Sequence, residues 1–159
     1  MLILFADSNV FIEALFIENS AASVVLELVT QGNFDLATCQ QVVSDVEKAI
    51  LNKLTFSQNS LNVIIKSWEE YKEKTRVIII KDPSESLVER TYHDFIGIMK
   101  HKADIPILAA AITMEPRPVA IISGNREHFN DNVSKRCGIY IGSCQEFIEL
   151  LSQRGIVHK

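Results

Sequence analysis

The stretch MLILFADSNVFIEAL (residues 1–15) decides the fold of this chain. Its first six residues are a continuous apolar run, which predicts a short buried strand. The pattern over residues 9–18 then predicts an amphipathic helix, with Ser8 or Asn9 available as its N-cap. Asp7 therefore lies where the first strand ends and the first helix begins. In open α/β sheets, binding sites are built at such positions.

The rest of the chain continues to alternate strands and helices. We expect further strands at residues 33–37, 76–81, 119–122 and 139–141. We expect further helices at residues 20–30, 39–54, 57–74 and 84–91, from residue 104 onward and from residue 143 onward. Ser84 should cap one helix, and Ser143 with Glu146 forms a capping box that opens the last one. RVIIIK (76–81) is the clearest buried strand, because β-branched residues dominate it. This alternation predicts an α/β fold, a three-layer α/β/α sandwich around a central, mostly parallel sheet, in a single domain over residues 1–159.

The composition narrows the class of protein. Of 159 residues, 47% are hydrophobic and 23% are charged, and only 6 Gly and 4 Pro interrupt them, which is typical of a folded globular chain. The net charge of −4 leaves no overall basic character of the kind that simple nucleic-acid binders carry. The 3 Cys show no CxxC spacing, which favours reduced thiols over disulfides or zinc. The first apolar run is too short for a signal peptide or a membrane span, so we expect a cytoplasmic protein with no membrane contact.

Three other segments place acidic or amide side chains in settings similar to that of Asp7. Asn125 follows a predicted strand in the loop SGNREHF, and the carboxyl ends of parallel strands meet at one edge of a sheet. Asp104 opens the helical segment DIPILAAAI, where the helix dipole favours a carboxylate. Asp45 lies inside a helix, although Asp is a weaker helix former than Glu. If the segments converge, their carboxylates repel one another unless a divalent cation lies between them.

Each of these residues also has a purely structural interpretation. Asp104 can cap its helix, Asn125 can belong to a simple turn, and Asp45 or its neighbour Glu47 can be a solvated charge on a helix. Asp7 is harder to explain in this way, because a charge directly after a buried strand needs a partner. For each of these residues, both the structural and the functional interpretation stay open at this point.

Two further groups of residues are expected to be structural. His128 should pack or cap rather than bind metal, because no second His stands at ligand spacing. Trp68 and Tyr71 should form the core and the rim of a helix rather than a platform for bases.

At these segments the chain resembles the PIN domain family of nucleases, and the resemblance covers nearly the whole chain. DSNV (7–10) matches the family's Asp-Thr/Ser-Asn-Val after a first hydrophobic strand. VVSDVEKAI places Asp45 where the family has an acidic residue within a helix, and KADIPILAAAI matches the Asp that opens an alanine-rich helix. SGNREHF matches Thr/Ser-Gly-Asp/Asn followed by His-Phe. No single motif is specific, and their order and spacing carry the resemblance.

The chain departs from the family pattern at two positions. Asp45 stands where the family usually has Glu, which shortens the side chain by one methylene and leaves Glu47 as the alternative if the register is shifted. Asn125 stands where many members have Asp, which removes one negative charge from the site.

The resemblance implies a metal-dependent endoribonuclease that hydrolyses RNA phosphodiester bonds. A set of oxygen ligands without His or Cys selects Mg²⁺ or Mn²⁺. The implied catalytic set is Asp7, Asp45, Asp104 and Asn125. Of these, Asp7, Asp104 and Asn125 would hold the metal, while Asp45 would orient the attacking water. The residues expected to fix the carboxylates by hydrogen bonds are Ser8, Asn9 and Ser123.

The resemblance also implies partners. RNA is the expected substrate, with Lys100, His101, Lys102 and Arg126 as candidate phosphate contacts. Stand-alone family members of this size are often VapC-like toxins of toxin–antitoxin pairs, which predicts a small antitoxin protein as partner and a homodimer.

Two other classes of function are weighed against the nuclease. A PIN-like module that has lost catalysis and binds RNA or protein for regulation is suggested by Asp45 and Asn125. A receiver-type domain phosphorylated on Asp7 is less well supported, because that fold needs its acceptor on a later strand and a Lys after a further one. The absence of GxGxxG and GxxxxGK[ST] removes support for dinucleotide and P-loop sites.

Overall fold

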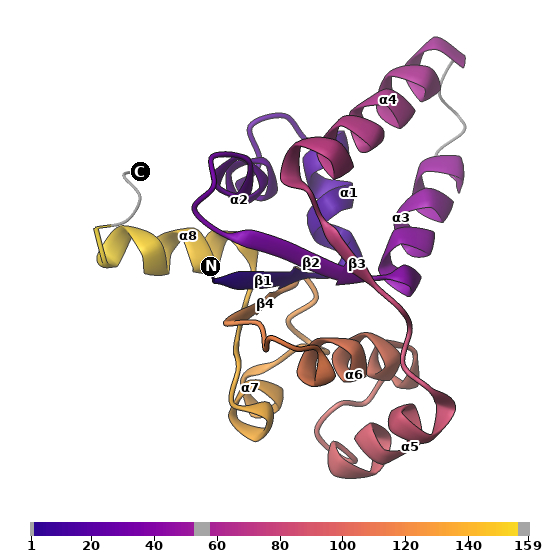
Figure 1. Ribbon diagram of the computed structural model, residues 1–159, viewed down its shortest axis with the longest axis vertical. Coiled ribbons are helices and arrows are strands. Elements are labelled where there is room, and N and C mark those ends of the chain that lie inside the picture. Colours follow the sequence, from indigo (N-terminus) through magenta and orange to yellow (C-terminus); the bar gives the residue numbers. More distant parts are fainter. Residues whose placement is uncertain (1, 53–57, 156–159) are drawn as a thin grey trace.

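A parallel sheet forms the centre of the protein in a computed structural model that describes residues 2–52 and 58–155 (Figure 1). Its strands are β1 (Ile3–Ala6), β2 (Asp35–Cys39), β3 (Ile78–Ile80), β4 (Ala120–Ile122) and β5 (Tyr140–Gly142). Their order across the sheet is β3-β2-β1-β4-β5, and each neighbouring pair is parallel. In the register, Leu4 of β1 pairs with Leu36 on one side and with Ala120 on the other. The first strand predicted from the sequence is thus the central one.

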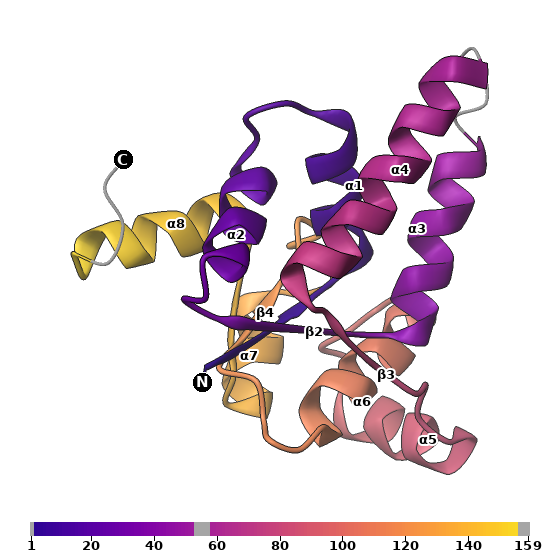
Figure 2. The same ribbon diagram turned by 45° about the horizontal axis from the view of Figure 1, so that its top comes forward.

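Helices cover both faces of the sheet, which confirms the predicted α/β/α layers (Figure 1). One face carries α1 (Ser8–Phe16), α2 (Ala21–Thr30), α3 (Gln40–Asn52) and α4 (Gln58–Thr75). The other face carries α5 (Glu85–Asp94), the short 3-10 helix η1 (Lys102–Asp104), α6 (Ile105–Thr113) and α7 (Asp131–Cys137). The last helix, α8 (Cys144–Gln153), lies against α2. Figure 2 shows α3 and α4 side by side.

Capping residues set several helix starts as expected. The Ser84 hydroxyl accepts a hydrogen bond from the Leu87 backbone N–H at the start of α5. Ser143 and Glu146 form the predicted capping box of α8. The start of α1 differs from the prediction, because Asp7 rather than Ser8 or Asn9 is its N-cap. A carboxylate one residue earlier accepts from the first backbone N–H of the helix and so takes the capping position.

The predicted buried strand at 76–81 is shorter and more exposed than expected. Only Ile78–Ile80 form β3, and this strand lies at the edge of the sheet. Ile78 is 44% exposed and Ile79 is 40% exposed. A β-branched run favours a strand, but its place in the sheet depends on how the whole chain is connected.

Two further differences concern the end of one strand and a helix that the sequence did not suggest. Strand β2 runs to Cys39, beyond the predicted end at residue 37. Helix α7 was not predicted, although Asn130 caps its start and Gly138, with φ of 73°, ends it in the left-handed conformation. Its seven residues are too few to give a clear helical period.

Apolar side chains from both layers pack on the sheet and form one core. Trp68 of α4 is buried and meets the ring of Phe11 of α1 edge-on, with ring centroids 5.4 Å apart, while Tyr71 is half-buried, as the sequence predicted for this pair. The buried face of α3 consists of Val42, Val43, Val46 and Ile50, which follow a helical period, and the predicted end of this helix at residue 54 lies outside the described residues. All three cysteines are free thiols. Among residues 2–52 and 58–155, no helix is long and apolar enough to cross a membrane.

Candidate active site

Asp7 occupies the carboxyl end of the central strand and is held there from several directions. Its backbone N–H donates to the Ile122 carbonyl at 3.0 Å, which continues the pairing of β1 with β4. The side chain is only 4% exposed. One carboxylate oxygen accepts from the Ser8 backbone N–H at 2.7 Å, and the other accepts from the Ser123 hydroxyl at 2.8 Å. The orientation of this carboxylate is therefore fixed before any ligand binds.

Burial makes the charge on Asp7 costly. The pKa of Asp7 is raised above its ordinary value, mainly by burial, and the hydrogen bonds from Ser123 and Ser8 only partly offset this effect. Negative charges on Asp104 and Asp45 raise it further. The fold thus brings carboxylates from three distant segments close enough for the charges of Asp104 and Asp45 to disfavour the ionisation of Asp7.

Asp45, rather than Glu47, belongs to this group. Asp45 is half-buried on α3, and burial is the main reason that its pKa is raised. The positive charge of Lys48 opposes this rise, and the negative charges of Asp104 and Asp82 add to it. Glu47 is exposed, and its carboxylate accepts a hydrogen bond from the Trp68 indole N–H at 3.5 Å. Two residues along a helix point in different directions, so the register that matches the family motif is also the one that faces the site.

Asp104 occupies the N-cap position of α6 but does not act as a cap. Its φ and ψ are −91° and −12°, in the helical region, and its side chain makes no capping hydrogen bond. Pro106 in the first turn supplies no N–H to be capped. The carboxylate instead contacts the His128 ring, with 2.5 Å between Asp104 Oδ2 and His128 Nδ1. The structural interpretation of Asp104 as a helix cap is therefore wrong.

His128 is a member of the site that the sequence did not suggest. Its Nδ1 lies 2.7 Å from the Asn125 amide nitrogen as well as close to Asp104. An unprotonated Nδ1 accepts from Asn125, whereas a protonated Nδ1 donates to Asp104, so one nitrogen serves one partner at a time. The His101 ring stacks on the His128 ring at 3.8 Å between centroids. The only sequence signal for His128 is its place in the SGNREHF motif.

Ser123 and Asn9 join the two loops that frame the site. The Ser123 hydroxyl donates to Asp7 and accepts from the Asn125 backbone N–H at 3.1 Å and from the Asn9 amide at 3.3 Å. The Asn9 carbonyl oxygen accepts from the Gly124 N–H at 2.7 Å. Ser8, Asn9 and Ser123 all contact Asp7 as the sequence suggested, Ser8 through its backbone. Asn125 is thereby linked to Asp7 on one side and to Asp104 on the other.

The Arg126 side chain is paired with carboxylates outside the candidate site. Its guanidinium pairs with Asp131 at 2.6 Å and with Glu146 at 2.9 Å, and it also donates to the Phe129 carbonyl. These contacts weigh against the expected phosphate contact by Arg126, which stays a prediction. Lys100, His101 and Lys102 are exposed.

The donor set suits a hard cation that keeps much of its water. In the described part of the chain, no three His, Cys, Asp or Glu side chains are gathered closely enough to hold a metal by themselves. Mg²⁺ commonly takes only one or two protein carboxylates and fills its other positions with water. The fixed, buried Asp7 carboxylate and the nearby Asp104 meet that requirement, and Asn125 adds an amide oxygen. A cation between them would also remove the repulsion that raises the pKa of Asp7.

Comparisons with known proteins agree with this architecture. No protein-family model and no curated protein sequence matches the chain. Among solved structures, one chain of VapBC2 from Rickettsia felis, bound to a DNA fragment from their promoter, matches with a TM-score of 0.61 at 16% identity, covering 88% of this chain and 97% of that one. One chain of FitAcB from Neisseria gonorrhoeae matches with a TM-score of 0.61 at 16% identity, covering 89% of this chain and 98% of that one. The chain therefore shares the fold of one chain in each of these complexes, in agreement with the PIN-like α/β fold that its motifs predicted.

Proposed function

We propose that this protein is a metal-dependent endoribonuclease that hydrolyses RNA phosphodiester bonds. The observation that carries the proposal is the environment of Asp7. This residue is 4% exposed, hydrogen bonds from Ser8 and Ser123 hold its carboxylate, and burial together with the charges of Asp104 and Asp45 raises its pKa. A folded chain gains nothing in stability from placing three carboxylates within range of one another. Their convergence is explained by a function that requires a cation.

In the proposed mechanism, Asp7, Asp104 and the Asn125 amide oxygen would hold the metal. A bound Mg²⁺ or Mn²⁺ would polarise the scissile phosphate and make a nearby water more acidic. Asp45 orients the attacking water and accepts its proton, a role favoured by its raised pKa. Ser123 and the Ser8 backbone N–H keep the Asp7 carboxylate in place through the reaction.

We further propose that the nuclease is the toxin of a toxin–antitoxin pair and that a small antitoxin protein inhibits it. The support for this role is the shared fold with chains of the VapBC2 and FitAcB structures over most of their length. If a small reading frame neighbours the gene, its co-expression should relieve any growth arrest that expression of this chain causes. The homodimer implied by the family resemblance stays a prediction, which light scattering of the purified protein checks.

A regulatory module without catalysis is the second candidate. Two observations favour it: Asp45 is shorter than the family's usual Glu, and one Asp104 oxygen contacts His128. A module of this kind would bind RNA or metal without turnover. The double variant Asp45→Glu/Asn125→Asp should then gain cleavage activity that the natural sequence lacks.

Cleavage of a labelled single-stranded RNA separates the two candidates. The nuclease proposal expects products with MgCl₂ or MnCl₂, none with EDTA, and losses of at least about 100-fold in Asp7→Asn and Asp104→Asn. Asp131→Asn is the matched control, because this exposed carboxylate pairs with Arg126 outside the site. Cleavage that persists unchanged in both site variants would refute the assignment of these residues.

A further inference from the structure

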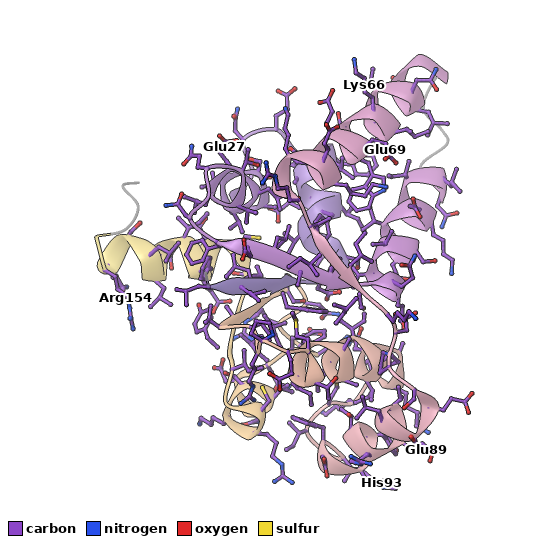
Figure 3. All side chains as sticks on the ribbon, viewed as in Figure 1. Glu27, Lys66, Glu69, Glu89, His93 and Arg154 are labelled. Atoms are coloured by element: carbon purple, nitrogen blue, oxygen red, sulfur yellow. The ribbon has the colours of Figure 1, made fainter. Side chains whose placement is uncertain are left out.

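A pocket lies beside the candidate active site, between α5 and the turn from η1 into α6. Its volume is about 430 Å³, within the range of small-ligand sites. It is lined by Val88, Glu89, Tyr92, His93, Lys102 and Ile105. Figure 3 labels Glu89 and His93 on the outer helix α5. None of these residues has a part in the chemistry proposed above.

The pocket and the active site share one turn of the chain. Lys102 is two residues before Asp104, and Ile105 directly follows it. Lys102 and Ile105 face the pocket, while the Asp104 carboxylate faces His128. Residues adjacent in sequence therefore contribute to the pocket and to the carboxylate site, so neighbouring nucleotides of one strand could occupy both.

The side chains in the pocket suit a base rather than a simple anion. Tyr92 presents a half-buried ring, and Lys102 Nζ lies 5.0 Å from the centre of that ring. The His93 ring meets Tyr92 edge-on at 5.8 Å. The Glu89 carboxylate would repel a phosphate, but it can accept a hydrogen bond from the amino group of a base. A ring, a cation and an acceptor in one pocket are the elements of single-strand recognition by stacking.

We infer that this pocket binds one unpaired base of the RNA substrate, next to the phosphate that is cut. The inference rests on the proposed ribonuclease function and names the part of the chain that positions the strand. The base replaces the Lys102 ammonium over the Tyr92 ring and stacks there, the released Lys102 reaches the adjoining phosphate, and Glu89 accepts a hydrogen bond from the exposed edge of the base. The pocket thereby fixes which phosphate reaches Asp7 and Asp104.

Binding of a single-stranded RNA oligonucleotide, measured by fluorescence anisotropy, tests the inference. The Asp7→Asn chain serves as the starting protein, so that the RNA stays intact. Adding Tyr92→Ala should weaken binding by roughly 5- to 150-fold, the range for loss of one stacked base, while adding Tyr92→Phe should change it less than about twofold. Thermal unfolding of each variant shows that the fold is intact.

A scan with abasic nucleotides supplies a second measurement. One abasic position should weaken binding to the protein with Tyr92 intact and leave binding to Tyr92→Ala unchanged. In the chain with Asp7 intact, Tyr92→Ala should raise KM more than it lowers kcat. If RNA is bound and cut, yet Tyr92→Ala keeps full affinity and the scan is flat, the pocket inference is wrong and the ribonuclease proposal stands. If no variant binds RNA at all, both fall.

Discussion

Replacing Ser123 with alanine tests whether the hydrogen bonds around Asp7 hold the site together. The Ser123 hydroxyl is fully buried and donates to the Asp7 carboxylate at 2.8 Å. A hydrogen bond to a charged group contributes about 1.5–3 kcal/mol, and the bond accepted from the Asn125 N–H adds about 1 kcal/mol. Ser123→Ala should therefore lower the free energy of unfolding by about 2–4 kcal/mol at pH 8.

The size of this effect should depend on pH in a defined direction. The bond from Ser123 lowers the pKa of Asp7, so the variant has a native pKa raised even further above the ordinary value. Its native state then binds a proton more tightly than the unfolded chain does. As the pH falls through this raised pKa, Asp7 becomes neutral and the variant recovers part of its lost stability. The difference between the two proteins should be largest at pH 8 and smaller near pH 5.

Ser152→Ala is the matched control. The Ser152 hydroxyl is also buried, but it has no hydrogen-bond partner in the part of the chain that the structure describes. Removing an unsatisfied buried hydroxyl should leave stability unchanged or raise it by up to about 1 kcal/mol. The same substitution at the two serines thus has opposite expected signs.

Urea unfolding at pH 5 and pH 8, followed by circular dichroism, measures all three proteins. Calorimetric titration with MgCl₂ adds a functional readout, since loss of a residue that orients a metal ligand weakens affinity by about 10- to 100-fold. Equal losses for the two serines, or a loss for Ser123→Ala that is independent of pH, would refute the reasoning.

Further perturbations test the charges and the core. Because the native pKa of Asp7 is raised, the metal-free protein should lose stability as the pH rises through that pKa. Asp7→Asn should abolish this loss of stability. Urea unfolding at pH 5 and pH 8 measures both proteins. Asp7→Asn should also bind RNA more tightly than the natural chain in EDTA while failing to cut it, which anisotropy and gel assays measure. Asp45→Asn should slow single-turnover RNA cleavage by at least about 10-fold, whereas Glu47→Gln, on the exposed side of α3, should not. Phe11→Ala should lower the free energy of unfolding by about 3–5 kcal/mol, since its buried ring packs edge-on against Trp68.

The sequence was most informative where local signals and position in the chain agree. A continuous apolar run that ends in Asp7 identifies a buried strand and its carboxyl end without reference to any other segment. The capping box at Ser143 is equally local and is found as predicted. The same reasoning found the strand Ile78–Ile80 but was wrong about its burial, because an apolar run does not say whether its strand has one neighbour or two.

The candidate site was predictable in part for a similar reason. Asp7, Asp45 and Asp104 were found through the order of the family motifs, and the fold brings them within electrostatic range of one another. The local rule predicted that the Asp104 side chain caps its helix. In the structure this side chain makes no capping hydrogen bond and instead contacts His128 from a distant segment. Neither the His128 contact nor its stacking on His101 has a local signal, since both depend on how two loops meet in the folded chain.

If the protein is the proposed nuclease, its charge balance predicts that a cation takes part in RNA binding as well as in cleavage. The chain has a net charge of −4, and the cation nearest the SGN loop, Arg126, is neutralised by two carboxylates. An RNA phosphate that approaches Asp7, Asp45 and Asp104 meets like charges in a partly desolvated site, where repulsion is stronger than in water. Lys100 and Lys102 are exposed, so salt weakens their attraction for the phosphate at the carboxylates. In the proposed nuclease, affinity for the scissile phosphate would therefore come from a metal ion at the carboxylates. Asp7→Asn neutralises one carboxylate and would replace only part of the charge of that ion.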